Sequence, residues 1–216
     1  MTQHDPEIAY RYLDDEDHAA RLLNGHVWLS TLRRIRTMDS IRADSEEAML
    51  TYRPGSVDSE ARDEVTAKKM ENLRTIGIDV HSGGRVNLHG NNMVFRRVMP
   101  DAFVFCTSEL PPNPKLVRLF GKYCVRIELV PAFWHAITQA LREKFLLAEA
   151  DFGRVQYRGR SFQQSDHVDS VMFVGPEPNR DEAEVRLYWT VEGAVEITPI
   201  EVFSPRAAEW LTLVPT

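Results

Sequence analysis

A continuous apolar run at residues 103–107 constrains the fold of this chain more than any other feature. The run reads Phe-Val-Phe-Cys-Thr, and a second one, Tyr-Cys-Val-Arg-Ile-Glu-Leu-Val, follows at residues 123–130. A strand with one wet face alternates polar and apolar residues, whereas a strand buried on both faces is apolar throughout. We therefore expect two strands buried on both faces, joined by a non-helical connection because three prolines lie between residues 111 and 114.

The rest of the chain predicts helices early and strands late. Residues 8–13 alternate like a strand, residues 14–24 carry acidic residues in a first helical turn and stop at Gly25, and residues 26–31 return to a strand. Pro131 opens a helix whose stripe should belong to the core. Further strands are expected at 153–158, 168–174, 184–191 and 195–203, and a short helix at 205–211. The apolar stripe of the helix that begins at Pro131 consists of Trp134, Ile137, Leu141, Phe145 and Ala148.

The intervening segments are polar. We expect a surface loop with one helical turn at 33–52, a partly exposed helix at 58–76 and a glycine- and asparagine-rich hairpin or loop at 81–92. Helices that precede strands favour an α+β fold over alternating α/β units. With no repeat and no convincing linker, residues 1–216 are expected to form a single domain.

Charge and composition exclude several classes of protein. The net charge of -6 argues against a surface built broadly for nucleic acid, although a local basic groove is still allowed. The chain has no apolar run of about 18 residues and no signal-peptide pattern, so we expect a cytoplasmic protein that does not bind membranes. Cys106 and Cys124 lie inside the strand-like runs and should be buried thiols.

Familiar catalytic and metal motifs are missing from the sequence. None of the seven histidines forms an i, i+4 pair with another or lies near a cysteine at ligand spacing, so we expect no metal site. The glycine-rich phosphate loops and the Gly-x-Ser-x-Gly elbow are also absent. This pattern disfavours hydride transfer, kinase-like chemistry and the hydrolases that use this elbow.

The segment 181–187, Asp-Glu-Ala-Glu-Val-Arg-Leu, carries the strongest chemical hint. In a strand, the period of two places Glu182, Glu184 and Arg186 on one face. Two neighbouring carboxylates suit a reaction that builds positive charge on a sugar, because one can stabilise an oxocarbenium ion while the other orients or deprotonates an acceptor. The alternative is an ordinary solvent-exposed strand face.

The order of short motifs resembles that of ADP-ribosyltransferases. Tyr-Arg-Tyr at 10–12, Leu-Ser-Thr at 29–31 and Glu-x-Glu at 182–184 follow the Arg, Ser-Thr, Glu-x-Glu order of that family. The chain is also similar to a group of bacterial proteins related to that fold, several of them linked to toxins or phage defence. This wider similarity includes Phe-x-Phe-Cys-Thr-Ser, Phe-Gly-Lys-Tyr-Cys-Val and Glu-x-Glu-Val-Arg. Leu32 departs from the family's clearest Ser-Thr-Ser triplet, which leaves the acceptor open.

The resemblance implies an α+β fold with a split β-sheet core and an enzyme that cleaves nicotinamide from NAD and transfers ADP-ribose. NAD would be the substrate, without a metal. Arg11 would bind the pyrophosphate or its ribose, with Tyr12 in the same binding set, and Ser30, supported by Thr31, would shape the nicotinamide pocket and help hold the catalytic glutamate. Glu184 would bind the ribose hydroxyl and stabilise the cation, and Glu182 would direct the acceptor. The residues alone leave two alternatives open. Arg11 could instead pair with a nearby aspartate, and Ser30 and Thr31 could be hydroxyl groups of a turn at the end of the strand.

The acceptor is the least constrained part of this interpretation. Arg33, Arg34 and Arg36 directly follow Ser30 and Thr31 and could contact phosphates of NAD or of an RNA or DNA acceptor. Alternatively they form a solvated loop neutralised by nearby acidic residues. A protein acceptor, or water as in an NAD glycohydrolase, is also open. The resemblance suggests a toxin or phage-defence effector with a cognate antitoxin; the competing hypothesis is a non-catalytic module that senses a nucleotide or a phage component.

Overall fold

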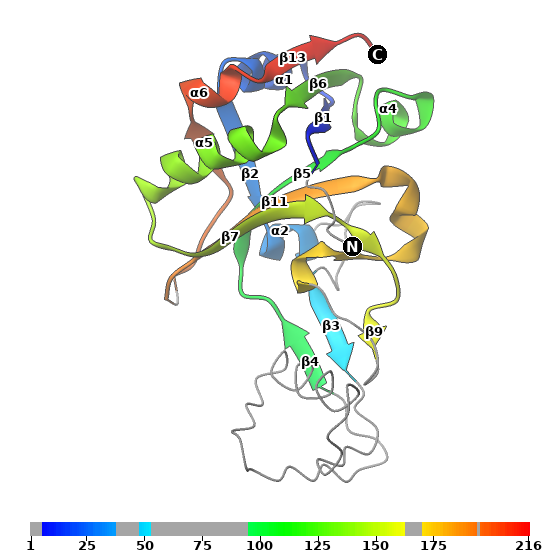
Figure 1. Ribbon diagram of the computed structural model, residues 1–216, viewed down its shortest axis with the longest axis vertical. Coiled ribbons are helices and arrows are strands. Elements are labelled where there is room, and N and C mark those ends of the chain that lie inside the picture. The colour runs from blue at the N-terminus through cyan, green and yellow to red at the C-terminus, as the bar shows by residue number, and fades with distance from the viewer. Residues whose placement is uncertain (1–5, 38–47, 53–94, 163–169, 194) are drawn as a thin grey trace, which may run out of the picture.

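The computed structural model describes residues 6–37, 48–52, 95–162, 170–193 and 195–216. Within these ranges the chain combines several helices with a mainly antiparallel sheet, as the α+β prediction requires (Figure 1). The helix expected at 58–76 and the hairpin expected at 81–92 lie outside the described residues.

An eight-stranded sheet forms the centre of the molecule. Its strands follow the order β12-β2-β5-β1-β6-β13, with β11 paired to β5 and β7 paired to β11, and all of these pairs are antiparallel. The strands are β1 (Ile8–Leu13), β2 (His26–Thr31), β5 (Ala102–Ser108), β6 (Tyr123–Glu128), β7 (Leu147–Arg154), β11 (Glu184–Val191), β12 (Ile200–Phe203) and β13 (Leu211–Val214).

Strand β5 confirms the prediction of a strand buried on both faces. One of its edges pairs with β11 over residues 102–108. The opposite edge is shared by two strands in tandem, because Ser30 and Thr31 of β2 pair with Val104 and Phe103, whereas Tyr10 of β1 pairs with Ser108. Residues 105–107 of β5 lie between these two pairings. The sheet therefore separates at this point into one wing of β2 and β12 and another of β1, β6 and β13.

Helices cover one face of the sheet with the main core. The longest is α5 (Val130–Arg142), which buries Phe133, Ile137 and Leu141 against β5, β11 and their neighbours. Helices α1 (Glu16–Leu23) and α6 (Pro205–Ala208) add to the same core. Asp15 begins α1 by accepting hydrogen bonds from the backbone N–H groups of Asp17 and His18. In Figure 1 these helices lie above β7 and β11.

The opposite face carries two separate apolar clusters. The first joins Val104 of β5 and Tyr188 of β11 to Leu32 of α2 (Leu32–Thr37) and to the one-turn helix η1 (Val171–Phe173). The second packs Tyr12 of β1 against α4 (Pro114–Phe120). Cys106, Glu184 and Arg186 lie on the same face between the residues of these clusters, as the strand registers require. A polar strip therefore interrupts the apolar packing of this face.

Several sequence-based expectations were wrong in detail. The helical turn expected at 33–52 is α2, but this segment also contains β3 (Met49–Tyr52), which pairs with β4 (Phe95–Val98) and β9 (Ser161–Phe162). The proline-rich connection contains α4, because Pro114 occupies its first turn and Asn113 caps it. Helix α5 ends at Arg142, so Ala148 is exposed on β7 rather than in the core. Helices are thus spread along the chain instead of clustering in its N-terminal half.

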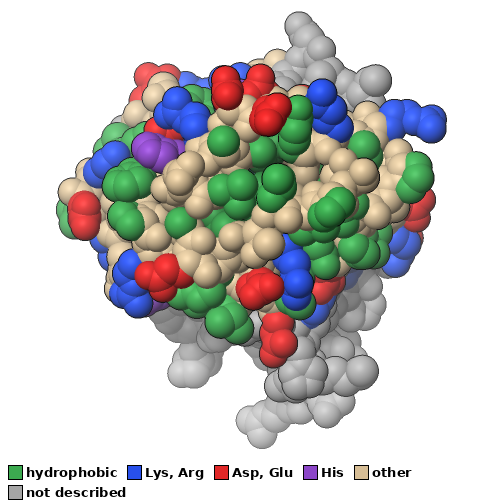
Figure 2. All heavy atoms as spheres, turned by 90° about the horizontal axis from the view of Figure 1, so that it is seen from above, with side chains coloured by type: hydrophobic (Ala, Val, Ile, Leu, Met, Phe, Trp, Pro, Cys, Tyr) green, Lys and Arg blue, Asp and Glu red, His purple; other side chains and the backbone are tan. Residues whose placement is uncertain are grey.

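The C-terminal region differs in a similar way. The expected strand at 195–203 is confined to β12, and the expected helix at 205–211 ends at Ala208 and is followed by β13. Among the described residues, no helix is long and apolar enough to span a membrane. Figure 2 shows the molecule from above, with basic and acidic side chains interspersed around apolar ones.

Candidate functional site

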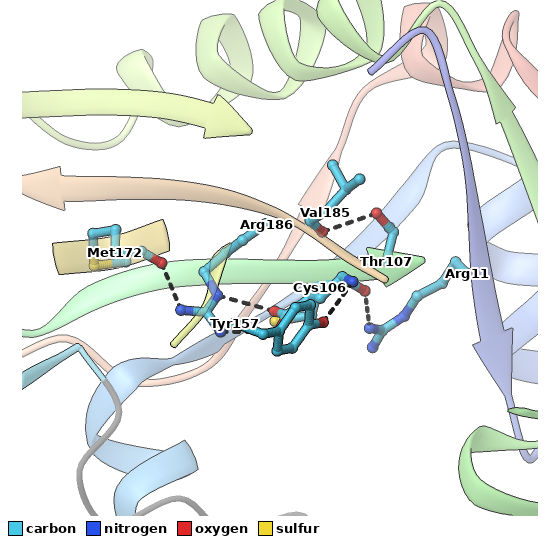
Figure 3. A network of polar contacts seen from close by, with 8 residues as sticks. Arg11, Cys106, Thr107, Tyr157, Met172, Val185 and Arg186 are labelled. Carbon is cyan, nitrogen blue, oxygen red and sulfur yellow. Dashed lines mark hydrogen bonds and ion pairs between the residues drawn. The ribbon is translucent and has the colours of Figure 1, made fainter. Parts of the chain in front are cut away.

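Arg11 lies where β1 and β2 separate from β5. Its Nη1 donates a hydrogen bond to the carbonyl oxygen of Cys106, and its guanidinium carbon lies 5.0 Å from the centre of the Phe105 ring. The Cys106 carbonyl lies between the pairings of β5 with β2 and β1, so the Arg11 side chain supplies the hydrogen-bond donor that the backbone of a neighbouring strand would otherwise supply. Figure 3 shows Arg11 reaching from β1 toward Cys106. The guanidinium is therefore fixed at the division of the sheet.

Glu184 and Arg186 form a two-point ion pair on β11. Arg186 Nε and Nη2 each lie 2.9 Å from a different carboxylate oxygen of Glu184. The side chains of Arg186 and Glu184 are only 3% and 14% exposed, so the pair is largely withdrawn from water. Nη1 of Arg186 also donates to the carbonyl of Met172 at 2.6 Å. Such parallel, charge-assisted bonds fix the carboxylate in orientation as well as in position.

Tyr157 holds the backbone at the start of β11. This residue belongs to β8 (Gln156–Tyr157), and its hydroxyl oxygen accepts a hydrogen bond of 2.8 Å from the backbone N–H of Glu184. Burial raises the pKa of the Tyr157 hydroxyl well above its usual range, and the negative charges of Glu184 and Glu182 act in the same direction. The phenol therefore stays protonated and keeps a hydrogen-bond donor beside Glu184.

Cys106 connects these groups electrostatically. Burial, followed by the charge of Glu184, raises the pKa of the Cys106 thiol, whereas Arg186 and Arg11 oppose that rise. Glu184 and Arg186 of β11 share a face of the sheet with the Cys106 side chain, whereas Arg11 of β1 reaches the Cys106 carbonyl from the side of Phe105. We refer to Arg11, Cys106, Tyr157, Glu184 and Arg186 as the polar cluster.

Glu182 does not share the strand face of Glu184. It ends the short helix η2 (Glu177–Glu182), and Ala183 follows with a φ of 44° in the left-handed region. The period-two argument fails because the strand begins only at Glu184. The carbonyl of Glu182 accepts a 2.6 Å hydrogen bond from the hydroxyl of Ser108. Glu182 is nevertheless close enough for its charge to influence Tyr157.

Three other predicted residues lie away from the polar cluster. Tyr12 is buried between β1 and α4, where its hydroxyl donates to the carbonyl of Leu110 at 2.9 Å. Ser30 pairs with Val104, four residues along β5 from the position opposite Glu184, which corresponds to about 13 Å. Thr31 is buried and accepts a hydrogen bond from the backbone of Arg34, which stabilises the start of α2. Ser30 is thus not placed to hold Glu184 directly.

The predicted arginine cluster is partly committed to contacts within the protein. Arg33 pairs with the carboxylate of Glu196, and Arg36 donates to the carbonyl of Met99 at 3.3 Å. The side chain of Arg34 is exposed. Leu32, at the position of the missing serine, is fully buried in the apolar cluster of α2. Helix α2 therefore contributes less open positive charge than its sequence suggests.

Sequence reasoning missed Cys106, Tyr157 and Arg186 as members of the polar cluster. Arg186 had a signal, since it lies two residues after Glu184, but nothing near Tyr157 indicates its contact with a strand that begins many residues later. The described residues contain no group of three or more histidine, cysteine or acidic side chains placed to bind a metal ion. Comparison of the chain with protein-family profiles, curated proteins and solved structures yields no match.

Proposed function

We propose that this chain is an ADP-ribosyltransferase that cleaves the nicotinamide glycosidic bond of NAD and transfers ADP-ribose to a macromolecule. The observation that carries the proposal is that Arg11 and Glu184 both approach Cys106 at the division of the sheet, Arg11 at its carbonyl and Glu184 at its thiol. These residues come from opposite ends of the chain, and the motif order assigned them to NAD binding and catalysis. Their proximity supports a shared site for both roles.

The charges of the polar cluster suit the pyrophosphate and the nicotinamide ribose of NAD. Arg11 supplies positive charge for an anionic pyrophosphate, since the charge of Arg186 is already paired with Glu184. An ionised carboxylate has about four acceptor positions, of which Arg186 occupies two. Glu184 can therefore still accept a hydrogen bond from a ribose hydroxyl. Arg11 would donate to phosphate oxygens in addition to, or in place of, the Cys106 carbonyl.

The chemistry follows from this arrangement. The bond between the anomeric carbon and the nicotinamide nitrogen breaks, and the electron pair leaves with neutral nicotinamide. Glu184 stabilises the positive charge that develops on the ribose. An acceptor nucleophile then bonds to the same carbon and loses its proton to a base, for which Glu182 is the candidate. The partly buried Glu182 lies beyond Ala183, on a different element from Glu184, as separate roles would require.

The acceptor class follows less directly. Because Arg33 and Arg36 contact Glu196 and Met99, the exposed Arg34 is the residue of this group most open to the phosphates of a nucleic acid. A protein acceptor would need no basic surface, and water would need no recognition surface at all. RNA, DNA, protein and water are therefore separate arms of the test.

A second candidate function is a non-catalytic nucleotide-binding module. The observation that favours it is the two-point pairing of Glu184 with the buried Arg186, because such a pair can be a structural element in its own right. In that case the cluster would bind NAD or a related nucleotide without breaking it. The two candidates differ in nicotinamide release and agree in nucleotide binding.

The test is nicotinamide release from NAD by purified wild type and Glu184→Gln, with and without added RNA, DNA or protein. Glu109→Gln is the matched control, since Glu109 makes an equivalent two-point pair with Arg154 at 2.6 and 2.8 Å. We expect Glu184→Gln to lower the rate by about a hundredfold or more and Glu109→Gln to leave it near wild type. NAD binding without release would favour the second candidate, and neither binding nor release would refute both.

A further inference from the structure

Glu184 is held by a partner that the chain supplies from the same strand. Arg186 is one of the most buried charged residues among those described, at 2% exposure. Three of its nitrogens are committed, two to the carboxylate of Glu184 and one to the carbonyl of Met172. Figure 3 shows the guanidinium between Met172 and the start of β11. Its position is therefore fixed at both ends of the planar fork.

This burial restricts what Arg186 can do. A guanidinium withdrawn from water needs a negative partner, because an uncompensated buried charge is strongly unfavourable. The partner is Glu184, whose side chain is itself 14% exposed and so retains a small open surface. Arg186 is consequently too enclosed to bind substrate, whereas Glu184 is not. The buried guanidinium of Arg186 therefore holds the partly exposed carboxylate of Glu184 at the surface.

The anchor extends into the apolar cluster below the sheet. Met172 belongs to the short helix η1, is fully buried and packs with Val104 and Tyr188. Ser170 caps this helix by accepting a hydrogen bond from the backbone N–H of Met172. The chain η1, Arg186 and Glu184 thus links a rigid part of the protein to the carboxylate.

We propose that Arg186 is a positioning residue: it acts through Glu184, fixing the carboxylate for the ribose of NAD in the way expected of Ser30 from the motif order. This inference rests on the proposed function. Ser30 lies about 13 Å along the sheet from the position opposite Glu184, so the buried guanidinium is the group that orients the carboxylate. Loss of Arg186 should therefore affect the chemical step more than NAD binding.

The first arm of the test is kinetic and uses Arg186→Met, Arg186→Lys, Glu184→Gln and the double variant Glu184→Gln/Arg186→Met. We expect Arg186→Met to lower kcat by about a hundredfold with a small change in KM, and Arg186→Lys to recover part of that loss. In the Glu184→Gln background the Arg186→Met change should cause no further loss, because the two residues act as one unit. A further loss of similar size in that background would overturn the proposal.

The control variant is Arg154→Met, which breaks the equivalent pair with Glu109 on the neighbouring strand. We expect its kcat to remain near that of wild type. If Arg186→Met does not fold, Arg186→Lys and the double variant, which removes both charges of the pair, carry the same comparison. An equal loss of kcat in Arg154→Met and Arg186→Lys would indicate a merely structural effect and would count against positioning.

The second arm does not depend on activity. In protein labelled at the glutamate carboxyl carbons, the NMR signal of Glu184 is identified by its loss in Glu184→Gln. We expect this signal to move in Arg186→Lys and to stay in place in Arg154→Met. An unchanged signal in Arg186→Lys would overturn the positioning role. If wild type releases no nicotinamide while the signal moves, the proposed function fails but the orientation of Glu184 by Arg186 stands.

Discussion

At the residue scale, Arg11 lies at the division of the sheet and is the residue that we propose binds the pyrophosphate of NAD. Its guanidinium contacts the Cys106 carbonyl and the Phe105 ring, which belong to the stretch of β5 between its pairings with β2 and β1. A guanidinium offers a planar fork of donors to phosphate, whereas a lysine ammonium is a point charge. In the proposed complex with NAD, the side chain at this position orients the pyrophosphate as well as attracting it.

We predict that Arg11→Lys raises the KM for NAD by about tenfold while kcat changes little, since it removes one two-point contact from the bound substrate. Steady-state nicotinamide release measures both constants. The control is Arg21→Lys, because Arg21 is an exposed residue of α1 that pairs with Glu201 of β12. A fall in kcat without a change in KM would assign Arg11 to the chemical step instead.

At the element scale, the sequence predicted those elements whose contacts with the core produce a regular hydrophobic pattern. The apolar run of β5 and the alternation of Val185 and Leu187 on β11 were both visible because each side chain contacts the core directly. The alternation failed at Glu182, because the left-handed Ala183 ends the strand pattern there. Local periodicity thus predicts the body of an element better than its ends.

Other elements depend on partners that lie far away in the chain. Strand β3 is defined by pairing with β4 and β9, and β13 by pairing with β6, so neither has a strong pattern of its own. The same reason explains the site. Arg11 and Glu184 were predicted from motif order, whereas Tyr157 joined the cluster only through its contact with the backbone of Glu184.

Gly121, between α4 and β6, lies where the end of α4 approaches β1 closely. Its φ is 127°, and a Cβ at this position would lie 2.2 and 2.3 Å from the carbonyl carbon and oxygen of Leu13. These are backbone atoms of the adjacent strand β1, so they cannot move aside like a flexible side chain. We predict that Gly121→Ala lowers the free energy of unfolding by about 3 kcal/mol or prevents folding.

Denaturant unfolding of Gly121→Ala and Gly159→Ala measures this difference. Gly159 is the matched control because a Cβ there would meet no atom within 4 Å. We expect the control to change the free energy of unfolding by less than about 0.5 kcal/mol. Similar values for the two variants would mean that β1 and α4 do not approach each other as closely as the structure has them.

At the scale of the whole molecule, the two faces of the sheet differ in how they combine core and site. One face is a continuous apolar core beneath α5, α1 and α6. The other has two smaller clusters with the polar cluster between them, so the ionisable groups are largely buried without being part of a continuous core. The two apolar clusters also contain ionisable groups, namely Cys124, Tyr12 and Tyr188, which makes stability sensitive to their protonation.

Buried thiols and phenols make the folded protein sensitive to alkali. Burial raises the pKa of the Cys124 thiol to about 11, and it raises the pKa of Cys106 as well. It also raises the pKa values of Tyr12 and Tyr188 above their usual range. Since the folded state favours the neutral form, these groups contribute stability that is fully present below the pKa of the unfolded side chain. That stability is lost as pH rises through the higher pKa of the folded state.

We predict that the free energy of unfolding begins to fall near pH 9, where unfolded thiols ionise, and that Cys124 accounts for about 2 kcal/mol of the fall by pH 11. Denaturant unfolding at a series of pH values measures the slope. Cys124→Val keeps the apolar contacts of this fully buried side chain but removes its titration. The variant should therefore lose less stability than wild type over the same pH interval, because its unfolded state gains nothing from ionising a thiol. Parallel curves for the two proteins would show that Cys124 does not contribute and that the alkaline sensitivity lies in the tyrosines or in Cys106.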